Sequence, residues 1–292
     1  MENRKYRIVT DSSANLTDEL IDKYDIGIAS LVFYSGNKEF TSYVKGVKTD
    51  LKQFYDMLRK KDALTTSCVN EATFIEVFEP TLQEGLDILY IGFSSALSAT
   101  YISGEKAAAA LRKKYPERKI ITVNTLGASL GEGLLVLYAA RMQEAGASMK
   151  EVQNWLEQNR LKLCHYFTVD DLFFLFRGGR VKKTSYLIAN LVNIKPIMHM
   201  DDYGRLIPIG KVMGRKKSLN TIAEMVIRDI VDPEDQTICV SHGDCIEDVE
   251  YLKEKIEEKI KVKEWVINYV DPVVGAHSGP GTVAIFFLGN HR

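Results

Sequence analysis

This sequence has few cysteines, no long apolar run and almost no net charge. The four cysteines are scattered without C-x-x-C spacing, which indicates reduced thiols in a cytoplasm: Cys68, Cys164, Cys239 and Cys245. Lys and Arg number 38 against 39 Asp and Glu, so a net charge of −1 gives no reason to expect nucleic acid as a partner. No apolar run approaches the ~20 residues of a membrane-spanning helix, and the N-terminus lacks the apolar core of a signal peptide. We therefore expect a cytoplasmic protein without a membrane span.

Two nucleotide-binding patterns are also absent. No G-x-G-x-x-G follows the first strand pattern, where the sequence reads DSSANLT instead, and no G-x-x-x-x-G-K-[ST] occurs. His242, Asp244 and Cys245 are metal-ligand types, but no second cluster accompanies them, which favours a structural loop. We therefore predict no cofactor and no metal.

The first half of the chain alternates between strand and helix patterns. β-Branched and aromatic runs predict strands at 6–11, 26–34, 87–95 and 119–124. Apolar periodicity predicts helices at 17–24, 50–61, 70–83, 98–114 and 130–145, the first of them capped by Thr17. This alternation predicts an α/β domain, residues 1–160, with a mostly parallel sheet and helices on both faces.

The second half is richer in strand patterns. LKLCHYFTV, IKPIMHM, GRLIPIGKV, QTICVSH, KEWVINYV and TVAIFFLG are strand candidates, with DDYGR (201–205) as a hairpin turn. Helices are expected near 184–192, 216–230 and 246–260. We therefore predict a second, α+β domain at 161–292 with a mixed or antiparallel sheet. In a parallel sheet, ligands bind outside the carboxyl ends of the strands, here after residues 11, 93 and 124.

The stretch GASLG (127–131) matches the G-x-S-x-G pattern of a hydrolase nucleophile elbow. An elbow requires the strand to run straight into the turn, whereas Thr125 and Leu126 intervene here. Asp271 and His277 follow in the right order for a triad but stand only six residues apart. The other interpretation is a glycine-rich turn that lets segments approach closely. A serine hydrolase using Ser129 and His277 is therefore the alternative hypothesis.

Hydroxyl side chains cluster where ligands are expected. Asp11, Ser12 and Ser13 follow the first strand, a second group precedes the 70–83 helix, and a third lies between a strand and a helix. The last two groups are Thr65, Thr66 and Ser67, and Ser94, Ser95 and Ser98. Each hydroxyl is equally consistent with a helix cap. Taken together, hydroxyls and unpaired amides at helix starts suit a small anion such as a carboxylate or phosphate. His277, in a Gly/Pro-rich loop, is a further candidate ligand contact.

These motifs together resemble the DegV family of fatty-acid-binding proteins. The matching stretches are IVTDSSANLT, TTS before a helix, SSALSATYISG, VNTLGASLGEG, DLFFLFRGGRV, NIKPIM, KVMGRKKSL and HSGPGTVAIFFLG. The sequence departs from the family pattern in three places: Cys68-Val69-Asn70 stands where Gln-Pro-Ser is usual, Ala99 replaces a glycine, and Asn124 replaces an aspartate. These departures predict a reshaped head-group pocket.

The resemblance implies a two-domain α/β protein that holds a long-chain fatty acid between its domains and catalyses nothing alone. It implies that the carboxylate is held by a subset of the hydroxyls and a histidine: Thr66, Ser67, Ser94, Ser95, Ser98 and His277. Some family members present this carboxylate to a separate ATP-dependent fatty acid kinase. By the same resemblance, Arg177 and Arg180, with Lys182 and Lys183, would dock that partner. It also assigns Ser129 to a turn and not to a nucleophile.

Overall fold

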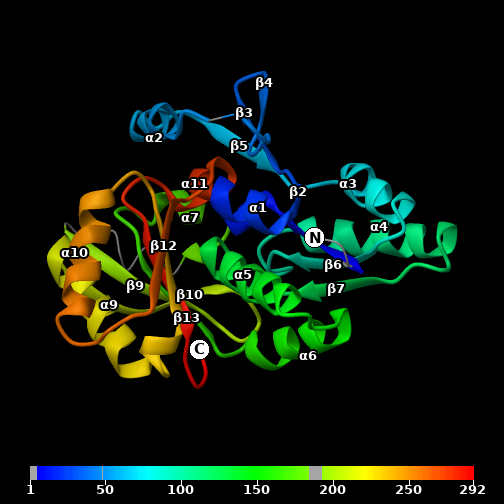
Figure 1. Ribbon diagram of the computed structural model, residues 1–292. Coiled ribbons are helices and arrows are strands. Elements are labelled where there is room, and N and C mark those ends of the chain that lie inside the picture. The colour runs from blue at the N-terminus through cyan, green and yellow to red at the C-terminus, as the bar shows by residue number, and fades with distance from the viewer. Residues whose placement is uncertain (1–4, 48, 184–192) are drawn as a thin grey trace.

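The computed structural model of the protein describes residues 5–47, 49–183 and 193–292. The helix expected at 184–192 lies outside the described residues. Two main β-sheets lie side by side with helices around and between them, and a small third sheet projects from the body (Figure 1). The predicted fold class is confirmed: an N-terminal parallel sheet with helices on both faces precedes a C-terminal unit with a mixed sheet.

The N-terminal sheet is entirely parallel. Its strands, in spatial order, are β2 (Gly27–Ala29), β1 (Tyr6–Asp11), β6 (Asp87–Gly92) and β7 (Ile120–Asn124). The helices of this half are α1 (Asp18–Tyr24), α2 (Leu51–Arg59), α3 (Glu71–Gln83), α4 (Thr100–Lys114), α5 (Leu130–Glu144) and α6 (Met149–Asn159), with the short 3-10 helix η1 (Ser12–Ala14). Alternate strand residues face opposite sides: Leu89 packs with α5 and α6, whereas Ile88 and Tyr90 pack with α3 and α4. Both faces are therefore covered.

The C-terminal sheet is mixed. Its strands, in spatial order, are β10 (Leu206–Met213), β9 (Ile194–Met200), β8 (Leu163–Thr168), β13 (Val283–Leu288), β11 (Thr237–His242) and β12 (Glu264–Tyr269). Only β11 and β12 run parallel; the other neighbours are antiparallel. The helices here are α7 (Phe173–Arg177), α9 (Arg215–Asp229), α10 (Ile246–Glu257) and α11 (Pro272–Ser278), with the 3-10 helix η2 (Pro233–Asp235). The predicted hairpin turn at 201–205 joins β9 to β10.

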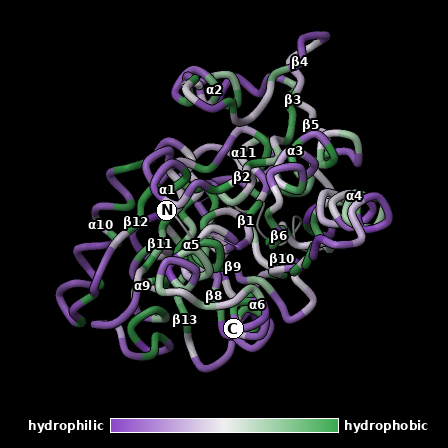
Figure 2. Tube along the Cα trace, turned by 45° about the vertical axis from the view of Figure 1, so that its right-hand side comes forward, coloured by the Kyte–Doolittle hydropathy of each residue, from purple (hydrophilic) through white to green (hydrophobic). Residues whose placement is uncertain are grey.

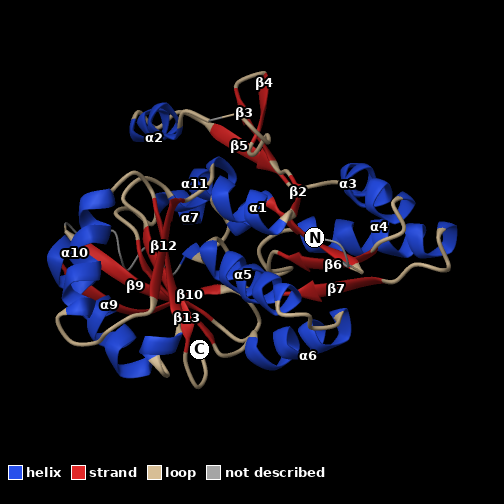
Figure 3. Ribbon diagram, in the orientation of Figure 1, coloured by secondary structure: helices blue, strands red, loops and turns tan. Residues whose placement is uncertain are grey.

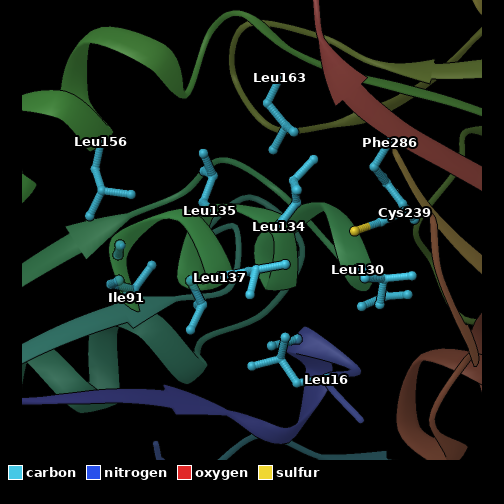
Figure 4. Packing of buried hydrophobic residues seen from close by; sticks show 14 of the residues in the cluster. Leu16, Ile91, Leu130, Leu134, Leu135, Leu137, Leu156, Leu163, Cys239 and Phe286 are labelled. Carbon is cyan, nitrogen blue, oxygen red and sulfur yellow. The ribbon is translucent and has the colours of Figure 1, made fainter. Parts of the chain in front are cut away.

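Helix α5 lies between the two sheets, and its residues from Leu130 to Ala140 are buried apart from the half-buried Tyr138. Its residues Leu130, Leu134 and Leu135 share one core with Leu163 and Phe286 of the second sheet, as Figure 4 shows. A helix that is apolar all round is expected at such a central position. Apolar residues gather towards this interior, while hydrophilic residues mark the outer turns of α4 and α10 (Figure 2). The two halves therefore share a core and meet across α5.

One part of the fold differs from the prediction. The apolar run at 26–34 was expected as one strand, but the chain divides it between β2 and β3 (Val32–Ser35), which belong to different sheets. β3 pairs with β4 (Lys38–Thr41) and β5 (Leu64–Ser67) in a small antiparallel sheet. At the point of division, the Ser12 hydroxyl accepts the Leu31 N–H at 3.0 Å. A tertiary contact therefore ends the first strand where local pattern gave no signal.

Helix caps follow the sequence more closely. The Thr17 side chain accepts the Leu20 N–H and begins α1, as predicted. Ser148 and Glu151 form a capping box at the start of α6.

α6 ends at Asn159 and β8 begins at Leu163. The domain boundary at 160 stays a prediction. None of the helices within the described ranges is both long and apolar enough to span a bilayer.

Candidate functional site

A cavity of about 600 Å³ opens at the carboxyl ends of the first sheet's strands. Segments that follow β1, β6 and β7 supply Ser13, Phe93 and Ala128 to its wall, as the parallel sheet predicts. The second sheet and its helices supply the opposite wall, including Phe167, Met200, Leu206, Val273 and Phe286. Ligand pockets of roughly 300–1,000 Å³ with apolar walls and a few polar groups typically hold small organic molecules. This cavity has both properties.

A polar cluster at one place in the wall joins Thr66 and His277. Thr66 lies on β5 and His277 on α11, and the Thr66 Oγ1 to His277 Nε2 distance is 2.8 Å. Burial, together with the charges of Arg180 and Arg177, lowers the pKa of His277 to about 4, so its ring is neutral at pH 7. A neutral ring that donates its Nε2–H to Thr66 leaves the threonine proton free for a ligand in the cavity.

The local sequence explains how His277 reaches this place. Asp271 caps α11 by accepting the Val273 and Val274 N–H groups, both at 3.1 Å, and Pro272 stands at the first helical position. α7 packs against α11 (Figure 3). A Cβ atom at Gly178, just after α7, would collide with His277 Nδ1. His277 was expected in a loop; the structure corrects this, since a capped helix presents it.

Ser67 and Ser98 also line the cavity, but their hydroxyls have protein partners. Ser67 donates to the Cys68 carbonyl at 3.3 Å. The Ser98 Oγ lies 2.9 Å from Thr100 Oγ1 and accepts the Thr100 N–H at 3.2 Å, at the start of α4. Both side chains are half-buried. The structure therefore brings Thr66, Ser67, Ser98 and His277 into one cavity wall.

Ser94 and Ser95 lie outside the cavity lining. Ser94 is fully buried, and its hydroxyl donates to the Gly204 carbonyl at 2.8 Å. Ser95 is exposed, and its hydroxyl accepts from the Asn124 side-chain amide at 2.7 Å. The structure thus separates these two serines from the other four predicted residues.

The two arginines predicted to dock a partner both line the cavity. Arg177 is exposed, stacks over the Phe173 and Phe174 rings, and donates to the Ala276 carbonyl at 3.4 Å. Arg180 is half-buried; it donates to the Leu97 carbonyl at 3.1 and 3.2 Å and also to the Gly178 carbonyl. Arg180 is therefore bonded to backbone carbonyls of the cavity wall, whereas the Arg177 side chain is exposed to solvent.

Ser129 has an unusual backbone, and none of the described histidines is hydrogen-bonded to its hydroxyl. It precedes α5 with φ 56° and ψ −147°, a conformation rare for a non-glycine residue. Its hydroxyl lies 2.5 Å from Asn15 Oδ1 and 2.8 Å from Ser241 Oγ, whereas His277 bonds Thr66. Asp271 caps α11 instead of orienting a histidine. The geometry therefore does not form the relay that the hydrolase alternative requires.

Sequence reasoning missed Glu132 and saw only part of the role of Asp11. Both carboxyl groups are fully buried directly behind the cavity wall, joined through Ser13. A lone glutamate between glycines at the start of an otherwise apolar helix was the available signal. Among the described residues, no group of three or more His, Cys, Asp or Glu side chains is placed to hold a metal ion.

The fold and site define a two-domain α/β protein with an apolar cavity and a polar cluster in its wall. Residues 5–290 match the family described as "Uncharacterised protein, DegV family". A DegV domain-containing protein of Clostridium perfringens is 44% identical over 291 residues, covering 99% of this chain and 99% of that relative. This chain belongs to the DegV family.

Two solved structures extend the comparison. A Thermotoga maritima protein whose structure is said to reveal a fatty acid binding function is 27% identical, with a TM-score of 0.84, covering 98% of this chain and 100% of that one. DegV of Bacillus subtilis, described as a fatty acid binding protein, is 25% identical, with a TM-score of 0.82, covering 99% and 100%. This chain is thus similar in fold, over nearly its whole length, to proteins described as binding fatty acids.

Proposed function

We propose that this protein binds one long-chain fatty acid, with the acyl tail in the apolar cavity and the carboxylate at the polar cluster. The observation that carries this proposal is the cavity itself: its walls are mostly apolar and of about the right capacity, and its lining includes the hydrogen-bonded pair Thr66 and His277. The relatives described as fatty acid binding proteins support the same ligand class.

Thr66, Ser67, Ser98 and His277 form the proposed carboxylate site. Hydroxyl donors suit a carboxylate, which accepts hydrogen bonds on both oxygens. Arg177 and Arg180 add positive electrostatic potential at this site. Their charges contribute, after burial, to the lowered pKa of His277. His277 acts by donating to Thr66 and turning the threonine proton towards the ligand. Ser94 and Ser95, also expected in this site, are left out of the proposal because other protein groups hold them outside the cavity lining.

The tail supplies most of the affinity. Burying about 14 methylenes at about 0.8 kcal/mol each gives about 11 kcal/mol before the costs of association. Losses of translational and conformational freedom remove a substantial part, which leaves binding between micromolar and nanomolar. The head-group donors then decide which end of the ligand sits at the polar cluster.

Titration of delipidated protein tests this proposal. Palmitic acid should displace a fluorescent fatty acid from the cavity stoichiometrically, and the corresponding primary alcohol should displace it less well. Equal displacement by acid and alcohol would contradict the assigned head-group site. Failure of both to displace would contradict the cavity as the acyl site.

We also propose that the bound carboxylate is presented to a separate ATP-dependent fatty acid kinase, through the surface around Arg177, Arg180, Lys182 and Lys183. The family resemblance supports this partner, and the exposure of Arg177, Lys182 and Lys183 beside the cavity supports the surface. Lys182 and Lys183 lie outside the cavity lining, so their charge can be reversed without touching the ligand. The double change to Glu should spare fatty acid binding and reduce acyl-phosphate formation with ATP and a cognate kinase. Acyl phosphate formed by this chain and ATP alone would contradict a purely binding role.

A further inference from the structure

Two buried carboxyl groups stand behind the cavity wall and share one serine hydroxyl. Asp11 ends β1 and Glu132 lies in the first turn of α5, and both residues are fully buried. Ser13 Oγ is hydrogen-bonded to Asp11 Oδ1 and lies 3.3 Å from Glu132 Oε2. None of the hydrogen bonds or ion pairs found for either carboxyl group in the described ranges involves a Lys, Arg or His. Two charged carboxylates at such a site would repel each other without compensation.

The donors around the two groups are unequal. Asp11 accepts the Ser13 hydroxyl and the Ser13 N–H on Oδ1, and the Phe93 N–H and the Tyr90 hydroxyl on Oδ2. Glu132 accepts the Thr10 hydroxyl on Oε1 at 2.8 Å, and Ser13 is the only hydrogen-bond partner of its Oε2 in the part of the chain that the structure describes. Four donors suit an ionised carboxylate, whereas one donor does not.

The number of protons on the Ser13 hydroxyl determines the direction of its contact with Glu132. The Ser13 hydroxyl has a single proton, and the closer acceptor, Asp11, takes it. The contact between Ser13 Oγ and Glu132 Oε2 is then a hydrogen bond only if the glutamic acid supplies the proton. Other groups that face the pair agree with this assignment: the Asp271 carboxyl disfavours a negative charge on Glu132, and the Tyr90 hydroxyl donates to Asp11.

We infer that Glu132 is a neutral carboxylic acid at pH 7, and that it donates to Ser13, which donates to ionised Asp11. This relay joins β1, the η1 turn and α5, and it holds Ser13 and Phe93, both of which line the cavity. Asp11 and Glu132 are therefore positioning residues for the cavity wall, a role that rests on the proposed fatty acid binding. Burial raises the pKa of Asp11 to about 6 and that of Glu132 well above its usual range, consistent with this order.

The two matching amide substitutions distinguish this assignment from its reverse. In Glu132→Gln the side-chain amide keeps both contacts, since its NH₂ donates to Ser13 and its oxygen accepts from Thr10. In Asp11→Asn an NH₂ group replaces an acceptor where only donors point. The Glu132→Gln variant should therefore unfold at the same urea concentration as the wild type and bind palmitic acid with the same affinity. Asp11→Asn should bind roughly tenfold more weakly and unfold at lower urea.

Infrared spectroscopy detects the proton on Glu132 directly. This measurement compares the wild type with Glu132→Gln, so it does not depend on whether Asp11→Asn folds. The wild type at pH 7 should show a carboxylic acid C=O band that Glu132→Gln removes. Glu144→Gln, an exposed change on the same helix, should leave the band in place. Survival of the band in Glu132→Gln, or failure of Glu132→Gln to fold, would overturn the inference. If wild type and all variants lack affinity for palmitic acid while the band behaves as stated, the proposed function fails and the relay stands.

Discussion

At the residue scale, the pair Thr66 and His277 carries the proposed chemistry. The two side chains are separated by 211 positions in sequence and meet at 2.8 Å in the cavity wall. Because the His277 ring is neutral at pH 7, it can direct the threonine proton without adding a charge of its own. In the proposed function, hydroxyl donors would orient a carboxylate at this site while the two nearby arginines supply positive potential.

Replacing Thr66 by Val tests this arrangement because it removes the hydroxyl and keeps the shape. We expect palmitic acid affinity to fall by roughly 1–3 kcal/mol, the cost of an unpaired buried group. Ser95→Ala is the control: Ser95 is exposed and outside the cavity lining, so affinity should hold. A displacement titration measures both variants. A larger loss in Ser95→Ala than in Thr66→Val would contradict the assigned head-group site.

The pKa of His277 also predicts how stability depends on pH. Burial and the two arginines lower this pKa from 6.5 in the unfolded chain to about 4. Below pH 6.5 the unfolded chain gains a proton that the folded chain refuses, so stability falls as pH falls towards 4. In His277→Gln this contribution disappears, and urea unfolding at pH 7.5 and pH 5 should show a smaller decrease than in wild type. His291→Gln, an exposed change, should keep the wild-type dependence.

At the element scale, the small sheet and α11 bring together what the rest of the chain keeps apart. β5 carries Thr66, α11 carries His277, and the segment just before α4 carries Ser98. Helix α2, which lies between β4 and β5 in the chain, contacts the second half through Tyr55, whose hydroxyl donates to the Val270 carbonyl at 2.8 Å, and through an ion pair between Arg59 and Asp244 at 2.6 Å. Three separate elements must therefore dock before the site exists.

Gly178 tests the packing of α7 on α11. A methyl group there would strike the His277 ring, so Gly178→Ala should displace the histidine and weaken palmitic acid binding at least as much as Thr66→Val. Gly179→Ala is the matched control, because Gly179 has φ 72° but an added Cβ atom there would meet nothing within 4 Å. That change should cost about 1 kcal/mol of stability and leave affinity unchanged. Equal binding by Gly178→Ala and wild type would contradict the close packing.

The sequence predicts those elements whose formation depends on interactions between residues close in the chain. The cap at Thr17, the apolar α5 and the parallel strands were all readable, because capping and periodicity act within a few residues. The break after β2 was not readable, since Ser12 imposes it from the loop after β1. The hydroxyl clusters of the sequence indicate candidate head-group residues. The sequence does not show, however, that Ser98 lines the cavity whereas Ser94 and Ser95 do not. Glu132 was missed because its meaning depends on Asp11 across the core.

At the scale of the whole molecule, the cavity lies where two halves meet over α5. A ligand that contacts both halves binds the folded state alone, so it should stabilise the protein by about 2.7 kcal/mol at 100 times its Kd. For a chain of 292 residues that corresponds to a rise in Tm of roughly 4 °C. Scanning calorimetry of delipidated protein with and without palmitic acid measures it. An unchanged Tm at saturating ligand would contradict binding across the two halves.

Native mass spectrometry of the purified protein shows whether one fatty acid occupies this cavity. The spectrum should contain one species heavier than the chain by the mass of a single long-chain fatty acid. Organic extraction should remove that mass, and gas chromatography of the extract should find about one fatty acid per chain. Folded protein at the bare chain mass, with no fatty acid in its extract, would contradict the claim.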